Sequence, residues 1–337
     1  MTELSPDRLD NILERATAVR VAMLGDLMLD IYLIGEVSRI SPEAPVPVVH
    51  VLEERAALGG AANVASNVVA LGASCDVLGC VGRDAAGMEI QRLFAAHEAG
   101  RIRAHLVERA DRPTTTKTRV MARKQQMVRF DREHDADLPD DCVEELLANI
   151  ERVVSRADAL VLEDYNKGVL VHRVIRAALA AAAAAGIPSV VDPKFRRFFE
   201  YKGATVFKPN VLELSTALGA PIAPENSAQL EGARRRIGCE HLLVTLGDKG
   251  MVLKSKGAAS GRIPALAREV YDVSGAGDTV TACVAVALAA GATVREAATL
   301  ANYAAAIGVT KPGVATVAPS ELRNIVNEMP LAGLPPS

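Results

Sequence analysis

The chain has 337 residues, of which 50% are hydrophobic and 23% are charged, and its formal net charge is −3. This length and composition allow a large buried core, in two domains or in one large α/β domain with an insert. The acidic balance, the aromatic content of 3% and the lack of tryptophan argue against a nucleic-acid-binding surface, which needs basic residues and stacking platforms. The basic run Arg234-Arg235-Arg236 is accordingly interpreted as the solvated end of a helix.

The cysteines and the N-terminal segment indicate the compartment. Five cysteines are scattered without metal-ligand spacing, which argues against a zinc site or a disulfide framework. Residues 1–20 are charged and helix-like, unlike a signal peptide, and the low-polarity stretch 177–185 is too short to span a bilayer. We therefore expect a cytoplasmic protein with no membrane partner.

Short apolar runs of strand length alternate with helical segments along the chain. The strand candidates are residues 19–24, 75–81, 159–162, 189–191, 205–207, 241–245 and 251–254, and the helix candidates are residues 61–71, 85–96, 171–185, 276–290 and 294–309. This alternation predicts an α/β fold with a mostly parallel central sheet flanked by helices.

Two segments interrupt the alternation. Residues 31–52 contain three prolines and several β-branched side chains, and residues 114–130 alternate Thr, Arg, Val and Gln. Both are interpreted as strand ribbons outside the main sheet, which together form a small β lid that excludes water from a site. The predicted division is an α/β core of residues 1–30, 53–113 and 131–328, a lid of residues 31–52 and 114–130, and a tail of residues 329–337.

The most informative segment is residues 272–279, a glycine-rich turn followed at once by a small apolar helix. In the run Gly275-Ala276-Gly277 the two glycines leave room for backbone N–H groups to crowd an anion, and the N-terminal dipole of the helix points at the same place. Asp278 lies in the first helical turn, where a carboxylate beside an anion hole suits a general base in phosphoryl transfer. The alternative is an acidic first turn after an ordinary glycine loop.

Two motifs together carry a resemblance to ribokinase-like sugar kinases of the PfkB family. They are the turn Gly59-Gly60-Ala61-Ala62-Asn63 and the segment of residues 272–279, in the order and spacing of that family's two signatures. The resemblance implies a ribokinase-like fold, with ATP and Mg²⁺ as cofactors. A P-loop kinase is disfavoured because its Gly-x-x-x-x-Gly-Lys-Ser/Thr loop is absent, and Gly25-Asp26 does not supply the Gly-x-Gly-x-x-Gly of a dinucleotide-binding fold.

Residues 25–30, 38–47, 116–119 and 125–126 are similar to the heptose 7-phosphate kinases of Gram-negative bacteria. That resemblance implies transfer of the ATP γ-phosphoryl group to the anomeric O1 of D-glycero-β-D-manno-heptose 7-phosphate, which gives the 1,7-bisphosphate for ADP-heptose and lipopolysaccharide inner-core biosynthesis. Many members of that family carry a fused nucleotidyltransferase, whereas here we expect a separate protein to supply it. Residues 161–168 resemble the family motif Asp-Tyr-x-Lys-Gly, with Glu163 where a small polar residue is expected.

Charge and position suggest roles on the sugar side. Asp26 and Asp30, near the end of the first strand, are expected to hold sugar hydroxyls, with Gly60 and Asn63 on the opposite wall. The alternative for Asp30 is a cap at the lid hinge. The substrate phosphate needs cations, and the candidates are Arg39, Lys117, Arg119, Arg129 and Lys167, with Arg39 and Lys167 preferred.

Other segments are assigned to the nucleotide. The resemblance implies that Lys208, Asn210 and Glu213 organise phosphate and Mg²⁺ through water, and that Thr245, Gly247, Gly250 and Asn302 contact the nucleotide. Asp192 is a further candidate for metal or phosphate. The alternatives are a helix N-cap for Asn210, an ordinary hairpin for residues 245–250 and a plain turn at Asp192.

Two other functions stay open. One is a kinase of the same fold for another sugar or sugar phosphate, and the other is a catalytically silent regulator that binds sugar or nucleotide. The presence of Gly275, Gly277 and Asp278 argues against the silent regulator. We also expect a homodimer in which the lid ribbons pair across a two-fold axis.

Overall fold

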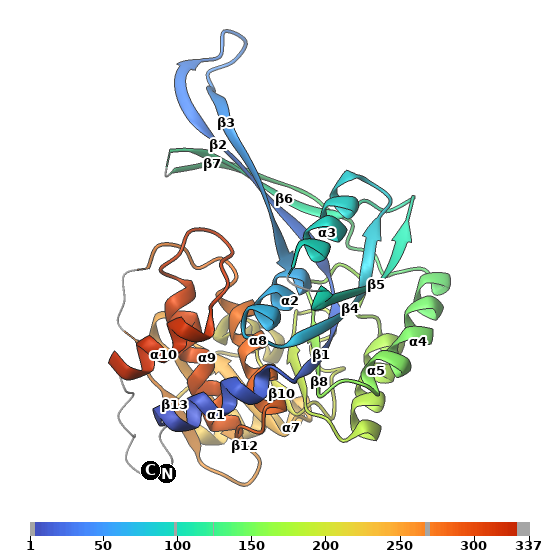
Figure 1. Cartoon of the computed structure of the whole chain (residues 1–337), viewed down its shortest axis with the longest axis vertical. Helices are drawn as coiled ribbons and strands as arrows, with labels where there is room; N and C mark the ends of the chain where they lie inside the picture. Colours follow the sequence, from blue (N-terminus) through green and yellow to red (C-terminus); the bar gives the residue numbers. More distant parts are fainter. Residues whose placement is uncertain (1–3, 98–99, 124, 267–269, 329–337) are drawn as a thin grey trace.

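Two β-sheets build the protein in the computed structural model, which describes residues 4–97, 100–123, 125–266 and 270–328. The larger sheet has nine strands and forms the middle of the molecule, and the smaller sheet has four strands and projects from it (Figure 1).

The central sheet confirms the predicted α/β class. Its strand order is β13-β12-β11-β10-β9-β8-β1-β4-β5. The strands from β5 to β11 run parallel in that order, and β12 and β13 are antiparallel at one edge. The strand bounds are β1 Arg20–Gly25, β4 Ser74–Gly82, β5 Ile102–Arg109, β8 Ala159–Glu163, β9 Ser189–Asp192, β10 Val206–Phe207, β11 His241–Thr245, β12 Met251–Ser255 and β13 Ser260–Ile263.

Helices cover both faces of this sheet, so that it has a hydrophobic core on each side. Along β1, Val21 and Met23 belong to one core and Ala22 and Leu24 to the other, as the alternation of side chains in a strand requires. The helices are α1 Pro6–Ala16, α2 Ala61–Ala70, α3 Ala85–Ala96, α4 Asp140–Val154, α5 His172–Ala185, α6 Val211–Leu218, α7 Ser227–Ile237, the 3₁₀ turn η2 Gly247–Lys249, α8 Ala276–Ala289, α9 Val294–Gly308 and α10 Pro319–Glu328. Within the described ranges, no helix combines the length and the apolar character that a membrane crossing requires.

The four-stranded sheet contains both segments that were predicted as strand ribbons. Its order is β3-β2-β6-β7, with bounds β2 Leu27–Ile40, β3 Pro47–Gly60, β6 Thr115–Ala122 and β7 Gln125–Arg132. The β2–β3 ribbon reaches far from the core in Figure 1. Only Asp26 separates β1 from β2, so the lid strands start directly at the end of the central sheet. Closure of the lid stays a prediction.

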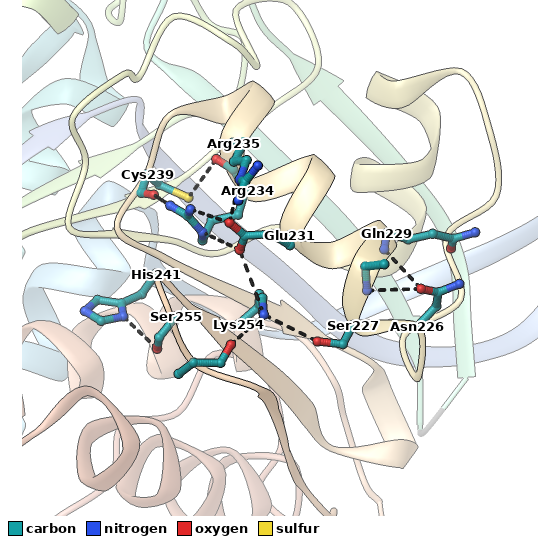
Figure 2. Close-up of polar contacts among 12 residues, drawn as sticks. Asn226, Ser227, Gln229, Glu231, Arg234, Arg235, Cys239, His241, Lys254 and Ser255 are labelled. Carbon is teal, nitrogen blue, oxygen red and sulfur yellow. Dashed lines mark hydrogen bonds and ion pairs between the residues drawn. The ribbon is translucent and has the colours of Figure 1, made fainter. Parts of the chain in front are cut away.

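The interpretation of residues 234–236 as a solvated helix end is only partly right. These residues do form the last turn of α7, but the side chain of Arg234 is buried. Arg234 pairs with Glu231 and donates to the carbonyl oxygen of Cys239 at 2.6 Å, which closes the end of the helix (Figure 2). Arg235 stays exposed and shares Glu231. A carboxylate three residues earlier makes burial of this guanidinium tolerable.

Candidate active site

Polar residues follow neighbouring parallel strands at the carboxyl edge of the central sheet. Gly25 of β1 lies opposite Glu163 of β8, and Glu163 lies opposite Asp192 of β9. Lys208 follows β10, the next strand in the sheet. Ligands of open α/β sheets bind at this edge, so these residues mark the candidate site.

The N-terminus of α8 faces the same edge and has the geometry of an anion site. Gly275 is the N-cap with φ of 76°, and a Cβ atom there would lie 2.7 Å from the amide nitrogen of Asn63. The N–H of Ala276 donates to Val273, whereas the N–H groups of Gly277 and Asp278 have no acceptor in the helix because they lie in its first turn. These two N–H groups and the helix dipole therefore attract an anion.

Asp278 is held beside this anion site by two hydrogen bonds. Its Oδ2 accepts from Nδ2 of Asn63 at 2.7 Å and its Oδ1 accepts from the hydroxyl of Tyr165 at 2.8 Å. Asn67 donates to Asn63 and thereby sets the orientation of its amide. Burial raises the pKa of Asp278 to about 6, with Asp192 adding to the rise and both hydrogen bonds opposing it. Such a carboxylate is ionised at neutral pH and more basic than usual, which suits a general base.

Tyr165 belongs to the Asp-Tyr-x-Lys-Gly motif, and its contact with Asp278 gives it a role that the sequence did not indicate. We expect Tyr165→Phe to lower kcat about 10–100-fold, because a hydrogen bond to a charged group contributes roughly 1.5–3 kcal/mol. The matched control is Tyr201→Phe, which removes a similar 2.7 Å bond from a buried tyrosine to Asp164 outside the site. Equal losses of kcat in the two variants would contradict a specific role for Tyr165.

The base of the lid lies over Tyr165 and carries charged groups. Asp30 is buried and forms an ion pair with Arg119. The ammonium of Lys117 lies 5.1 Å from the centre of the Tyr165 ring, and burial lowers the pKa of Lys117. Among the described residues, no carboxylate lies within 4.0 Å of Lys117. Lys117 is thus placed to accept an anionic partner.

Asp26 does not have the surroundings that the sequence suggested. Its carboxylate is 1% exposed and accepts backbone N–H groups of Tyr165, Lys167 and Val169 at 2.8, 2.9 and 3.2 Å. Burial raises the pKa of Asp26 to about 6. These contacts give Asp26 the task of holding the loop that carries Tyr165, and they leave it little surface for a sugar hydroxyl.

The predicted phosphate-binding cations are not all brought together. Arg39 is exposed and lies nine residues beyond Asp30 along β2, which corresponds to roughly 30 Å of extended strand. The preference for Arg39 is therefore wrong within one chain, because the ribbon carries it away from the site. Arg129 pairs with Asp131 at the surface, and Lys167 pairs with Glu133 at 2.9 Å.

A cavity of about 620 Å³ opens beside the N-terminus of α8. It brings together the predicted nucleotide residues Asn210, Thr245, Gly247, Gly250 and Asn302 with Ala276 and Gly277 of the anion site. Most of its wall is apolar and was not predicted; these residues include Leu266, Val270, Val273, Ala305 and Val309. A mostly apolar cavity with a few polar groups beside an anion site suits a nucleotide whose base is buried and whose phosphates point at the helix.

Asn210 and Glu213 form a capping box at the start of α6. The side chain of Asn210 accepts from the Glu213 N–H, and Glu213 accepts from the Asn210 N–H. The remaining oxygen of Glu213 binds the ammonium of Lys194. The helix-cap alternative for Asn210 is confirmed, while a contact of Glu213 with metal through water stays a prediction.

Three carboxylates form a group that suits a metal ion, and it differs from the predicted one. Glu163, Asp192 and Asp278 each offer one oxygen, and these oxygens lie within 4.8 Å of one another. The ammonium of buried Lys208 binds Asp192 at 2.7 Å. Asp192 was predicted as a metal residue, but Glu163 was not, and Glu213 is outside this group. Mg²⁺ binds oxygen ligands, usually one or two carboxylates together with waters and phosphates, and this group offers such carboxylates.

Comparison with known proteins places this arrangement in a family. Residues 19–321 match the family model described as pfkB family carbohydrate kinase. The chain belongs to the pfkB family. Curated relatives include the bifunctional protein HldE of Azorhizobium caulinodans, 47% identical over 90% of this chain and 63% of that protein, and HldE of Caulobacter vibrioides, 48% identical over 90% and 62%. The chain thus spans less than two thirds of the length of these relatives.

Solved structures confirm the ribokinase-like fold of this pfkB family chain. Arabidopsis thaliana ribokinase complexed with ribose and ATP has a TM-score of 0.68 at 23% identity and covers 94% of this chain and 100% of its own. Escherichia coli phosphofructokinase-2 in complex with substrates and products has a TM-score of 0.75 at 20% identity, with 93% and 99% covered. At these identities the likeness concerns the fold.

Proposed function

We propose that the chain is an ATP-dependent kinase that phosphorylates the anomeric O1 of D-glycero-β-D-manno-heptose 7-phosphate. The observation that carries this proposal is the position of Asp278. It lies in the first turn of α8, and Tyr165, which donates to it, also contacts the ammonium of Lys117 at the base of the lid. The proposed nucleotide cavity lies beside the N-terminus of α8, and Lys117 lies over the ring of Tyr165. The lid sequence that resembles heptose 7-phosphate kinases supports the choice of sugar, as do relatives that are 41–48% identical.

The chemistry follows from this arrangement. Asp278 accepts the proton of the anomeric hydroxyl, and the sugar oxygen forms a bond to the γ-phosphorus while the bond from that phosphorus to the bridging oxygen of ADP breaks. The N–H groups of Gly277 and Asp278, with Lys208, stabilise the charge on the moving phosphoryl group. Asp192 and Glu213 are the residues proposed to hold Mg²⁺, which would supply positive charge beside the phosphates when bound with the nucleotide. No covalent intermediate with the protein is needed.

The proposal is tested by Mg·ATP-dependent phosphorylation of heptose 7-phosphate, fructose phosphates, ribose and adenosine. Strong preference for the heptose phosphate is expected. Turnover of a different sugar would support the kinase activity but contradict the proposed substrate. Binding of ATP without turnover of any sugar would favour the silent regulator.

The contribution of the lid base is tested with Lys117→Met. We expect KM for the sugar phosphate to rise about 10–100-fold with KM for ATP unchanged, because a hydrogen bond to a charged group contributes roughly 1.5–3 kcal/mol. Steady-state kinetics in both substrates measure this. Arg39→Met is the comparison on the same sheet, and we expect normal KM in that variant because β2 carries Arg39 away from the site of its own chain. A larger effect of Arg39→Met than of Lys117→Met would place the phosphate at a site shared between two chains.

We also propose a homodimer that forms through the lid. Large apolar side chains lie exposed on the lid strands and their connecting loop, and they include Ile40, Val46, Leu52, Val128 and Phe130. Exposed apolar groups of this kind on sheet edges are typical of interfaces. We expect a mass in solution of twice the 35.5 kDa of one chain and a monomer for Leu52→Glu, measured by light scattering. Met88→Glu, an exposed apolar position on α3, is the control that should stay dimeric.

The cytoplasm is the proposed location, where ATP is available. The proposed product, a heptose 1,7-bisphosphate, needs later nucleotidyl transfer in ADP-heptose synthesis.

A further inference from the structure

Glu163 is the last residue of β8 and is fully buried. Within the described part of the chain, neither of its carboxylate oxygens has a hydrogen-bond partner. Leaving a buried carboxylate without a donor is costly, so an unpartnered one points to a ligand that supplies the missing charge.

The strand register explains why Glu163 lies against the site. Along β8, Ala159 and Val161 face the core that contains α8, whereas Leu160 and Leu162 face the other core. Glu163 therefore points toward α8. Asp192 lies beside it on β9, and the nearest oxygens of Glu163, Asp192 and Asp278 are within 4.8 Å of one another.

The local charge is not balanced by the protein. Lys208 compensates one of the three carboxylates through its contact with Asp192, and the nearby Lys194 is already paired with Glu213. A charge of −2 therefore remains when all three carboxylates are ionised. One divalent cation would cancel this remaining charge.

We propose that Glu163 and Asp192 bind one divalent cation directly, with Asp278 at its third side, and that this site exists before the nucleotide arrives. Oxygens that share one Mg²⁺ lie about 3 to 4 Å apart, so small side-chain movements suffice. The site opens toward the nucleotide cavity, since Gly277 lines that cavity and a Cβ atom on it would lie 3.8 Å from Asp192. The inference adds a cation site to the proposed kinase function, on which it rests.

The test is titration of the purified whole chain with Mn²⁺ in the absence of nucleotide and sugar, followed by electron paramagnetic resonance of the free ion, with Mg²⁺ as competitor. We expect one site per chain that Mg²⁺ displaces. Glu163→Gln should weaken Mn²⁺ binding at least tenfold, and Glu163→Ser should act in the same direction. Asp76→Asn, which changes a buried carboxylate at the opposite end of the sheet, should bind like the wild type.

A thermal melt gives a second readout that is independent of catalysis. Mg²⁺ should raise the melting temperature of the wild type and of Asp76→Asn but not of Glu163→Gln. Equal Mn²⁺ affinity in the wild type and Glu163→Gln, or no stoichiometric binding to the wild type, would overturn the cation site. Either result alongside normal phosphorylation of heptose 7-phosphate by the same preparation would leave the proposed kinase function intact.

Discussion

Replacement of Asp278 by asparagine is expected to lower kcat about 10²–10⁴-fold, the usual contribution of a general base, while ATP binding stays near normal. Asparagine keeps the shape of the side chain and one oxygen that accepts from Asn63, and its amide can donate to the Tyr165 hydroxyl. It cannot accept the proton of the sugar hydroxyl. The N–H groups at the start of α8 and the walls of the nucleotide cavity are unchanged.

Two measurements separate the base from the anion site. Turnover is measured with heptose 7-phosphate, and ATP affinity is measured by calorimetry. The matched control is Glu296→Gln, because Glu296 is also the third residue of a helix, α9, but pairs with Arg8 far from the site. Normal turnover of the Asp278→Asn variant would show that Asp278 is not the general base. Loss of ATP binding would show that the substitution disturbs the anion site.

The residues that local sequence brings forward as site candidates are those whose predicted role depends on local backbone geometry. Gly275, Gly277 and Asp278 lie within four residues, and a glycine turn before an apolar helix produces an anion site wherever it is placed. Asn210 and Glu213 are likewise close in sequence, at the N-cap and in the first turn of α6. The residues next to these positions in the chain are therefore enough to indicate the anion site and the helix cap.

Residues that act through contacts between distant segments were missed or misplaced. The register of β8 against β9 places Glu163 beside Asp192, and no local pattern shows that register. A usable signal was present, since a carboxylate ending a run of apolar strand residues is unusual unless it serves the site. Arg39 was misplaced because prolines and charges indicate a lid strand but not its length, which here carries the side chain away from the core.

Several elements were not predicted because their apolar residues are spread among charged ones. The amphipathic helices α4 and α10 bury only one face, and β5 alternates Ile102 and Leu106 with basic residues. A search for continuous apolar runs passes over such segments. The apolar wall of the nucleotide cavity was missed for another reason, because Val270 and Val309 meet only after folding.

Lys208→Met is expected to destabilise the protein by about 3–5 kcal/mol, the usual cost of breaking a buried ion pair. Lys208 is 3% exposed and its ammonium lies 2.7 Å from Asp192. Burial alone would lower the pKa of Lys208, but Asp192 and Glu163 outweigh burial and raise it. Methionine fills a similar space without charge. The loss of unfolding free energy therefore measures the cost of leaving the buried carboxylates without their positive partner. Urea unfolding without added metal gives the free energy, and exposed Lys202→Met is the control, expected within about 0.5 kcal/mol of the wild type.

The double variant Lys208→Met with Asp192→Asn shows whether this loss comes from charge or from packing. If charge decides, removal of both partners restores most of the stability, because the double variant no longer contains the unpaired Asp192 carboxylate. If the double variant is as unstable as the sum of the single variants, the lysine acts through packing, and the charge argument is wrong. Kinase activity should stay low in both cases, because Lys208 borders Gly277 of the anion site and its charge is needed beside the moving phosphoryl group.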